Sequence, residues 1–213
     1  MADSPPMPEH VGGRVALAKA LFRIGALRFG KFTLASGGPS SYRLDLSVVP
    51  SDSEAYGLAI AACVAAAKDL GEDKFDAVAG AGTGGVALSA PMAYLLKKPM
   101  LCVRGEGEGN GLGQRVEGAV RPGWRSLVIE DHLTTGRNVV SAVEALRKSG
   151  CVVKDALVLV DRLEGGRAAL KKSGVALWSF SDIRDLVETL FGEKMITKGD
   201  REAVARQMDG PRV

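Results

Sequence analysis

The sequence predicts an α/β fold in which a mainly parallel central sheet is flanked by helices, with a small N-terminal hood. Two observations support this prediction. Short apolar segments with the composition of buried strands recur along the chain, at residues 75–80, 100–103, 126–129, 156–160 and 177–180. The segments between them place apolar residues at helical spacing, and strands that alternate with helices form parallel sheets covered on both faces. Ligands bind such sheets at the carboxyl ends of the strands.

The N-terminal part of the chain is expected to contain a disordered start and then the hood. Residues 1–10 are rich in proline and polar groups, which is typical of a disordered terminus. An apolar stripe at helical spacing then predicts a helix over residues 15–24. This helix is assigned to a hood of about residues 11–50.

The next two helices flank the first strand. An alanine-rich helix runs to Leu70, and Ser51 or Ser53 is a suitable N-cap for it. After the strand at 75–80, a glycine loop at 80–85 leads into a helix through Leu88 to Leu96. Taken alone, this glycine pattern is equally consistent with an ordinary tight strand-to-helix connection.

The C-terminal half continues the alternation. Helices are predicted over 138–149 and 167–172, and the apolar spacing within 181–190 predicts a last amphipathic helix. Residues 193–213 form a polar, charged C-terminal extension, for which one more helix and a mobile tail both remain open.

The composition limits the classes of function. A chain of 213 residues suits one α/β domain, and its net charge of +3 comes from scattered lysines and arginines, so no nucleic-acid partner is expected. The three cysteines, Cys63, Cys102 and Cys151, have apolar neighbours and are interpreted as core residues, with no zinc-ligand spacing. The chain shows no signal peptide and no membrane-spanning run, so we expect a cytoplasmic protein with no membrane partner.

The most informative segment is 126–136, Ser-Leu-Val-Ile-Glu-Asp-His-Leu-Thr-Thr-Gly. A buried strand ends in two carboxylates, and a turn with two hydroxyls and a glycine then opens a helix. Backbone N–H groups at the helix start, together with these hydroxyls, would hold a phosphate monoester. Glu130 and Asp131 would accept hydrogen bonds from ribose hydroxyls or coordinate magnesium. The alternative is that the carboxylates cap the helix and the threonines are ordinary turn residues.

This segment resembles the phosphoribosyl-pyrophosphate (PRPP) signature of type I phosphoribosyltransferases. Residues 29–46 are similar to the orotate-loop motif of orotate phosphoribosyltransferases, and 160–167 to their Asp-Arg motif. The resemblance covers about residues 18–190 and implies a type I phosphoribosyltransferase domain over 11–192. It also implies transfer of the phosphoribosyl group of PRPP to orotate, giving orotidine 5-monophosphate and pyrophosphate in de novo pyrimidine biosynthesis. The implied cofactor is Mg²⁺, and the implied assembly is a homodimer.

The resemblance also implies the site residues. The implied catalytic residues are Asp131, Glu130 and Arg104, and magnesium would be bound through PRPP with Asp131 as a candidate ligand. The implied PRPP-binding residues are Gly82, Thr83, Gly84, Arg104, Glu130, Asp131, Leu133, Thr134, Thr135, Gly136 and Arg137. The implied orotate-binding residues are Ser36, Gly37, Tyr42, Arg43, Thr134 and Arg162. Two alternatives remain open: Tyr42 as a core aromatic, and Arg162 paired with Asp161 or Glu164.

The chain departs from the family pattern in its catalytic loop. Two lysines and a histidine of the usual loop are replaced by Gly105, Glu108 and Asn110, which removes cations that would neutralise pyrophosphate. Other relatives often have lysine where this chain has Ala35 and Gly84, and Arg43 and Arg137 are candidate substitutes. Two further hypotheses follow: a non-catalytic or regulatory protein that binds PRPP or a nucleotide, or a phosphoribosyltransferase for another base.

Overall fold

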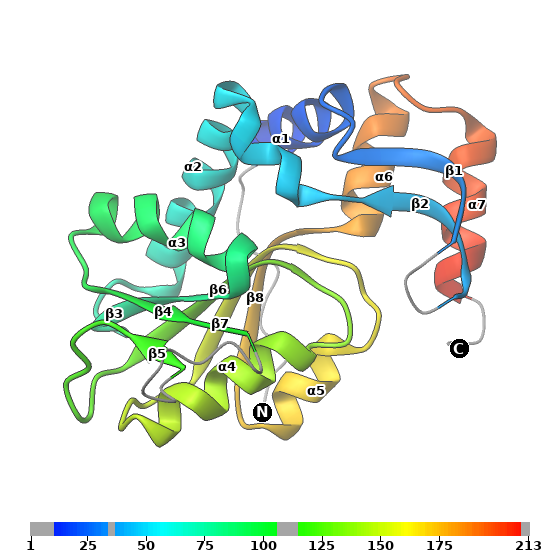
Figure 1. Ribbon diagram of the computed structural model, residues 1–213. Helices are drawn as coiled ribbons and strands as arrows, with labels where there is room; N and C mark the ends of the chain where they lie inside the picture. Colours follow the sequence, from blue (N-terminus) through cyan, green and yellow to red (C-terminus); the bar gives the residue numbers. More distant parts are fainter. Residues whose placement is uncertain (1–10, 34–36, 106–114, 210–213) are drawn as a thin grey trace. The chain divides into compact units, whose positions relative to one another are not determined.

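The computed structural model describes residues 11–33, 37–105 and 115–209 and divides into two compact units (Figure 1). We call residues 59–180 the sheet unit, and residues 11–58 with 181–209 the terminal unit. The predicted disordered start, residues 1–10, lies outside the described residues.

The sheet unit contains a six-stranded sheet in the order β5-β4-β3-β6-β7-β8. Strand β3 pairs in parallel with β4 and β6, and β6 pairs in parallel with β7, whereas β5 is antiparallel to β4. The predicted mainly parallel sheet is therefore confirmed. The strands are β3 (Ala77–Ala81), β4 (Met100–Val103), β5 (Val116–Glu117), β6 (Ser126–Leu133), β7 (Asp155–Asp161) and β8 (Ala176–Asp182).

Helices cover both faces of this sheet. In Figure 1, α2 (Ser53–Leu70) and α3 (Gly82–Leu96) lie on one side, and α4 (Arg137–Lys148) and α5 (Gly166–Lys172) lie on the other. Side chains alternate between the faces of a strand, so every second residue of β3 joins the core beneath α4. That core includes Ala79 of β3 and Val143 and Leu146 of α4, all buried. The central strands are buried on both faces, as expected for a parallel sheet.

Both tryptophans of the chain, Trp124 and Trp178, belong to the sheet unit. The indole Nε1 of Trp178 on β8 donates a hydrogen bond to Asp155 Oδ1 at the start of β7, at 2.9 Å. Cys63 and Cys151 are buried, as predicted, but Cys102 is only partly buried because it lies on β4 near the edge of the sheet.

The terminal unit is built from both ends of the chain. A salt bridge of 2.8 Å joins Lys19 Nζ to Glu193 Oε2, and α1 packs against α6. Another, also of 2.8 Å, joins Arg201 Nε of α7 to Glu188 Oε1 of α6. The unit contains α1 (Val11–Arg23), the antiparallel strands β1 (Leu27–Thr33) and β2 (Pro39–Leu44), a 3-10 turn at Leu46–Ser51, α6 (Ile183–Gly192) and α7 (Lys198–Asp209).

Three local predictions need correction, and one element was missed. The strand predicted to end at Ile129 continues through the acid pair to Leu133, because β7 pairs with β6 along this stretch. Helix α3 starts at Gly82, so most of the predicted glycine loop is the first turn of a helix. The side chain that caps α2 is Asp52, whose Oδ1 accepts from Ala55 N at 2.9 Å. The antiparallel hairpin of β1 and β2 was not predicted.

None of the helices in the described part of the chain combines the length and the apolar character that crossing a bilayer requires.

Candidate active site

The predicted phosphate-binding turn lies between β6 and α4. Thr134 and Thr135 follow the strand, and Gly136 has φ of +83° and is the N-cap of α4. No side chain in the described part of the chain caps this helix. Glu130 and Asp131 therefore do not have the capping role that was the alternative interpretation, and the first N–H groups of α4 are oriented to bind an anion.

The first member of the acid pair, Glu130, is buried within β6. Only 5% of its surface is exposed, and its Oε1 accepts a hydrogen bond from Asp131 N at 3.2 Å. Its Oε2 is buried and has no hydrogen-bond partner among the described residues. Burial, with the negative charge of Asp131 as a second cause, raises the pKa of Glu130 to about 8. At neutral pH this carboxyl group is therefore mainly protonated.

The second member, Asp131, has the opposite character. Its Oδ1 accepts two hydrogen bonds from His132, one from the backbone N at 2.7 Å and one involving ring Nδ1 at 2.8 Å. Burial raises the pKa of Asp131, but the hydrogen bonds and electrostatic attraction of His132, together with a hydrogen bond to the Glu130 side chain, hold it below its usual value. Two adjacent carboxyl groups therefore differ in charge: Glu130 is neutral and Asp131 is ionised.

The first turn of α3 contacts this acid pair. A β-carbon added to Gly84 would lie 2.5 Å from Cγ and from Oδ2 of Asp131, and one added to Gly82 would lie 3.9 Å from Oε2 of Glu130. A β-carbon on Gly85 would collide with the Ile129 carbonyl oxygen. The glycines thus have two roles: Gly85 allows α3 to approach β6, and Gly84 makes room for the Asp131 carboxylate. The interpretation as a tight strand-to-helix connection is therefore supported, and pyrophosphate binding by this segment stays a prediction.

Arg162 follows β7, and backbone hydrogen bonds join its segment to the turn between β6 and α4. Its N–H donates to the Leu133 carbonyl at 2.9 Å, and Gly166 N donates to the Thr134 carbonyl at 2.9 Å. The Arg162 side chain is only 10% exposed and forms a 2.8 Å ion pair with Glu164. The alternative pairing with Glu164 is thus present, whereas Asp161 accepts from Leu163 N and from Arg167.

Arg104 follows β4, the strand next to β3 in the sheet. Its guanidinium forms an ion pair with Glu117 of β5, in which Nη2 of Arg104 lies 2.6 Å from Oε1 of Glu117. The backbone carbonyl of Arg104 accepts a hydrogen bond from the Arg115 guanidinium. The carboxyl ends of β3, β4, β6 and β7 thus bring four predicted elements of the site to one edge of the sheet: the α3 turn, Arg104, the acid pair with its turn, and Arg162.

The sequence and fold of this chain are similar to those of known proteins. The chain is 37% identical over 187 residues to the orotate phosphoribosyltransferase of Cenarchaeum symbiosum, covering 87% of this chain and 92% of that protein. The crystal structure of orotate phosphoribosyltransferase from Aeropyrum pernix has a TM-score of 0.74 and 37% identity, covering 83% of this chain and 98% of that one.

The chain belongs to the orotate phosphoribosyltransferase family. The structure of Leishmania donovani UMP synthase is also similar, with a TM-score of 0.80 and 30% identity, covering 91% of this chain and 42% of that one. No family model matches the chain. The predicted family, the type I phosphoribosyltransferase fold and the enzyme class are confirmed by these similarities.

The orotate-side residues predicted from the family lie partly in the terminal unit. Tyr42 is 1% exposed on β2, which favours its alternative interpretation as a core aromatic. The Arg43 side chain is exposed and pairs with Asp45 at 3.3 Å. Gly37 precedes β2 with φ of +86°, and a β-carbon there would meet no atom within 4 Å. Ser36 lies outside the described residues, as do Ala35, Glu108 and Asn110 of the altered segments.

One structural residue near the orotate-loop motif was missed by the sequence analysis. Gln207 Oε1, on α7, accepts hydrogen bonds from Ser41 N at 2.6 Å and from Ser41 Oγ at 2.7 Å. Its Nε2 donates to Ser40 Oγ at 3.1 Å. A single glutamine in a charged helix has no sequence signature, so this link between α7 and β2 could be found only in three dimensions.

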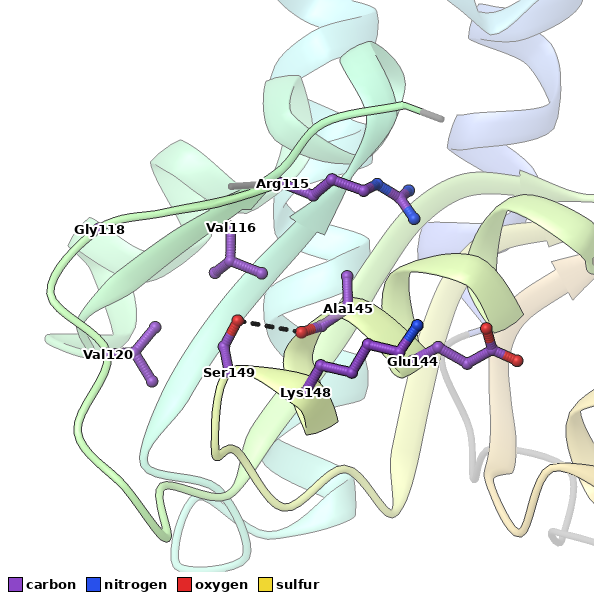
Figure 2. Close-up of a pocket in the computed structure, with 8 residues that line it drawn as sticks. All are labelled: Arg115, Val116, Gly118, Val120, Glu144, Ala145, Lys148 and Ser149. Atoms are coloured by element: carbon purple, nitrogen blue, oxygen red, sulfur yellow. Dashed lines mark hydrogen bonds between the residues drawn. The ribbon is translucent and has the colours of Figure 1, made fainter. Parts of the chain in front are cut away.

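A separate groove of about 530 Å³ lies between β5 and the C-terminal half of α4. Figure 2 shows its lining, with Arg115 on one side and Glu144 and Lys148 of α4 on the other. None of its lining residues is a predicted site residue of the orotate phosphoribosyltransferase family. We therefore do not assign substrate to this groove.

Proposed function

We propose that this chain transfers the phosphoribosyl group of PRPP to orotate, producing orotidine 5-monophosphate and pyrophosphate in de novo pyrimidine biosynthesis. In this reaction a ring nitrogen of orotate forms a bond to C1 of the ribose and its proton is released, while the bond from C1 to a pyrophosphate oxygen breaks and pyrophosphate leaves with that electron pair. The transition state resembles an oxocarbenium ion. Positive charge on the sugar and negative charge on the leaving group must therefore both be accommodated, and water must be excluded.

The observation that carries this proposal is the acid pair Glu130 and Asp131 on β6, beside a turn that leads into α4, a helix that no side chain in the described part of the chain caps. We assign the 5-phosphate to the turn of Thr134, Thr135 and Gly136, with Arg137 and Leu133 flanking it. We assign the ribose to Asp131, because a carboxylate accepts hydrogen bonds from hydroxyl groups and its negative charge would stabilise positive charge on the sugar.

We assign the other parts of the substrates to neighbouring elements. The pyrophosphate is assigned to the first turn of α3, Gly82–Thr83–Gly84, and to Arg104. The orotate carboxylate is assigned to Arg162, because a guanidinium offers a bidentate fork that matches a carboxylate. Glu164 already occupies part of that fork, so orotate binding would require Arg162 to exchange or share its partner.

Mg²⁺ is proposed as the cofactor, and the donor set of this site fits it. Magnesium in proteins is typically held by one or two carboxylates together with substrate phosphate oxygens. Asp131 supplies an ionised carboxylate. Oε2 of Glu130 is buried and has no hydrogen-bond partner among the described residues, so Glu130 would join the donor set on losing its proton. When bound, the metal would neutralise negative charge on the pyrophosphate. A homodimer and a cytoplasmic location are proposed with the function.

A steady-state assay tests the proposal directly. The purified chain, with orotate, PRPP and Mg²⁺, is expected to consume orotate absorbance and release pyrophosphate, and a chelator is expected to stop both. Asp131→Asn should reduce turnover by about 100-fold, since it removes a charge that acts on the transition state. The expected product is orotidine 5-monophosphate.

Two other outcomes would replace this function with the competing hypotheses. PRPP binding in a calorimeter without any product would identify a binding protein. Consumption of PRPP with another base but not with orotate would identify a different transferase. The variant that combines Glu108→Lys and Asn110→His, measured in the same assay, shows how much turnover the altered loop loses.

A further inference from the structure

We propose that His132 is a positioning residue for Asp131: the His132 ring fixes the orientation of the Asp131 carboxylate and so sets how well the site binds the ribose of PRPP. This inference rests on the proposed function, because it assigns the Asp131 carboxylate to the ribose.

The first support is the pattern of hydrogen bonds on one oxygen atom. Asp131 Oδ1 receives the His132 backbone N–H at 2.7 Å and the His132 ring Nδ1 at 2.8 Å. Any residue except proline at position 132 supplies the backbone bond, but only a side chain with a donor close to the backbone supplies the second one. The ring bond is therefore the contribution specific to histidine.

The second support is the identity of the donor. A carboxylate only accepts hydrogen bonds, so the proton in this contact is on Nδ1 of His132. In the neutral ring Nε2 is then unprotonated, and the hydrogen bond fixes both the tautomer and the ring orientation. Groups that hydrogen-bond to metal ligands orient those ligands in the same way, and their loss typically reduces metal affinity or activity 10- to 100-fold.

The third support is that the carboxylate is also confined by α3. A β-carbon on Gly84 would lie 2.5 Å from Oδ2 and 2.9 Å from Oδ1 of Asp131, so the carboxylate packs directly against the first turn of α3. The His132 side chain, by contrast, is one third exposed. The carboxylate is thus held by two contacts, the packing of α3 against both of its oxygens and the hydrogen bond of the His132 ring to Oδ1.

Three variants test this proposal. The amide nitrogen of asparagine lies near the position of Nδ1, so His132→Asn keeps the donor. His132→Leu removes it at similar size, and His132→Gln places a donor nearer the position of Nε2. For the Leu and Gln variants, kcat/KM for PRPP is expected to fall about 10- to 100-fold, with KM for orotate within about threefold of the original chain. His132→Asn should stay within about threefold for both substrates.

The outcomes separate this proposal from a merely structural role and from failure of the proposed function. Thermal unfolding of all variants checks that each is folded, and the Asn variant serves as the rescue. Three results would each overturn the proposal. They are an unchanged kcat/KM for PRPP in His132→Leu, a loss in His132→Asn as large as in His132→Leu, and equal rises in KM for orotate and for PRPP. If the original chain shows no turnover, the proposed function fails first. PRPP affinity measured by calorimetry on the same variants then decides the role of His132 separately.

Discussion

Gly84 and Asp131 are in such close contact that a β-carbon on Gly84 would lie 2.5 Å from the carboxyl carbon of Asp131. Residue 84 belongs to the first turn of α3 and residue 131 to β6, so this contact joins two strand-helix connections that the sequence separates by more than 40 positions. The absence of a side chain at position 84 is therefore part of what places the carboxylate, in addition to allowing the turn itself.

Gly84→Ala is expected to displace the Asp131 carboxylate and reduce kcat/KM for PRPP on the order of 100-fold, the typical effect of misplacing a catalytic group by about 1 Å. Steady-state kinetics measure the loss. Gly57→Ala is the matched control, because a β-carbon on this exposed helix residue meets no atom within 4 Å. That variant should keep full activity and gain up to about 1 kcal/mol of stability. Full activity of Gly84→Ala would contradict the prediction.

Arg162→Ala should raise KM for orotate by about 30-fold or more, because a buried guanidinium that pairs with a carboxylate contributes roughly 2 to 3 kcal/mol. KM for PRPP should change by less than about threefold. Glu164→Gln is the control, since it weakens the ion pair of Arg162 while keeping the guanidinium. If Arg162→Ala raised KM equally for orotate and for PRPP, the assignment of this residue to orotate would be contradicted.

Gly136→Ala should destabilise the chain more than Gly174→Ala does. Both glycines have positive φ, of +83° and +70°, so alanine costs about 1 to 2 kcal/mol of strain at either position. Only at position 136 would the new β-carbon also collide, at 2.9 Å from Leu170 Cδ1. Overpacking of this kind adds about 1 to 3 kcal/mol. Urea unfolding measures the difference, and equal free energies of unfolding for the two variants would refute the steric argument.

Glu130→Gln should change how stability depends on pH. The pKa of Glu130 is about 8 in the folded chain and near its ordinary 4.5 when unfolded, so the folded state binds more protons between these values. Stability from this group is complete below pH 4.5 and is lost as pH rises to about 8. The amide of the substituted glutamine stays neutral at every pH, so the variant should gain stability relative to the original chain as pH rises from about 5 to about 8.

Urea unfolding at several pH values, without divalent cations, measures this effect. Glu144→Gln is the control, because Glu144 is exposed on α4. Its stability should follow that of the original chain at every pH. If Glu130→Gln behaved in the same way, Glu130 would not be protonated in the folded state.

Gln207→Ala should lower the free energy of unfolding by about 1 to 2 kcal/mol, because it removes the acceptor for the Ser41 backbone N–H. Gln207→Glu keeps an oxygen at that position and should recover most of the loss. Urea unfolding followed by circular dichroism measures both variants. No loss in Gln207→Ala would mean that solvent replaces the glutamine without cost.

Much of the sheet, and the part of the site between β6 and α4, were predictable because their signals are local in the sequence. Buried parallel strands are short apolar runs, and the segment from Glu130 to Gly136 carries its acids, hydroxyls and glycine within seven consecutive positions. Since parallel strands bring their carboxyl ends to one edge, the strand assignments already implied that Arg162 and the acid pair lie at the same edge.

The rest depends on contacts between distant residues. The hairpin of β1 and β2 carries Arg28, Lys31 and Ser41 among its apolar residues, so its pattern does not identify a strand. The opposite charge states of Glu130 and Asp131 depend on burial and on His132. The composition of a short motif specifies neither how deeply its residues are buried nor which side chains they contact.

The distribution of tryptophans has a practical consequence. Because Trp124 and Trp178 both lie in residues 59–180, intrinsic indole fluorescence reports on only one of the two compact units. Tyr42 lies in the other unit, and far-ultraviolet dichroism records both. Overlaying the fluorescence and dichroism melting curves would therefore reveal whether the chain melts as a single cooperative block or in two stages.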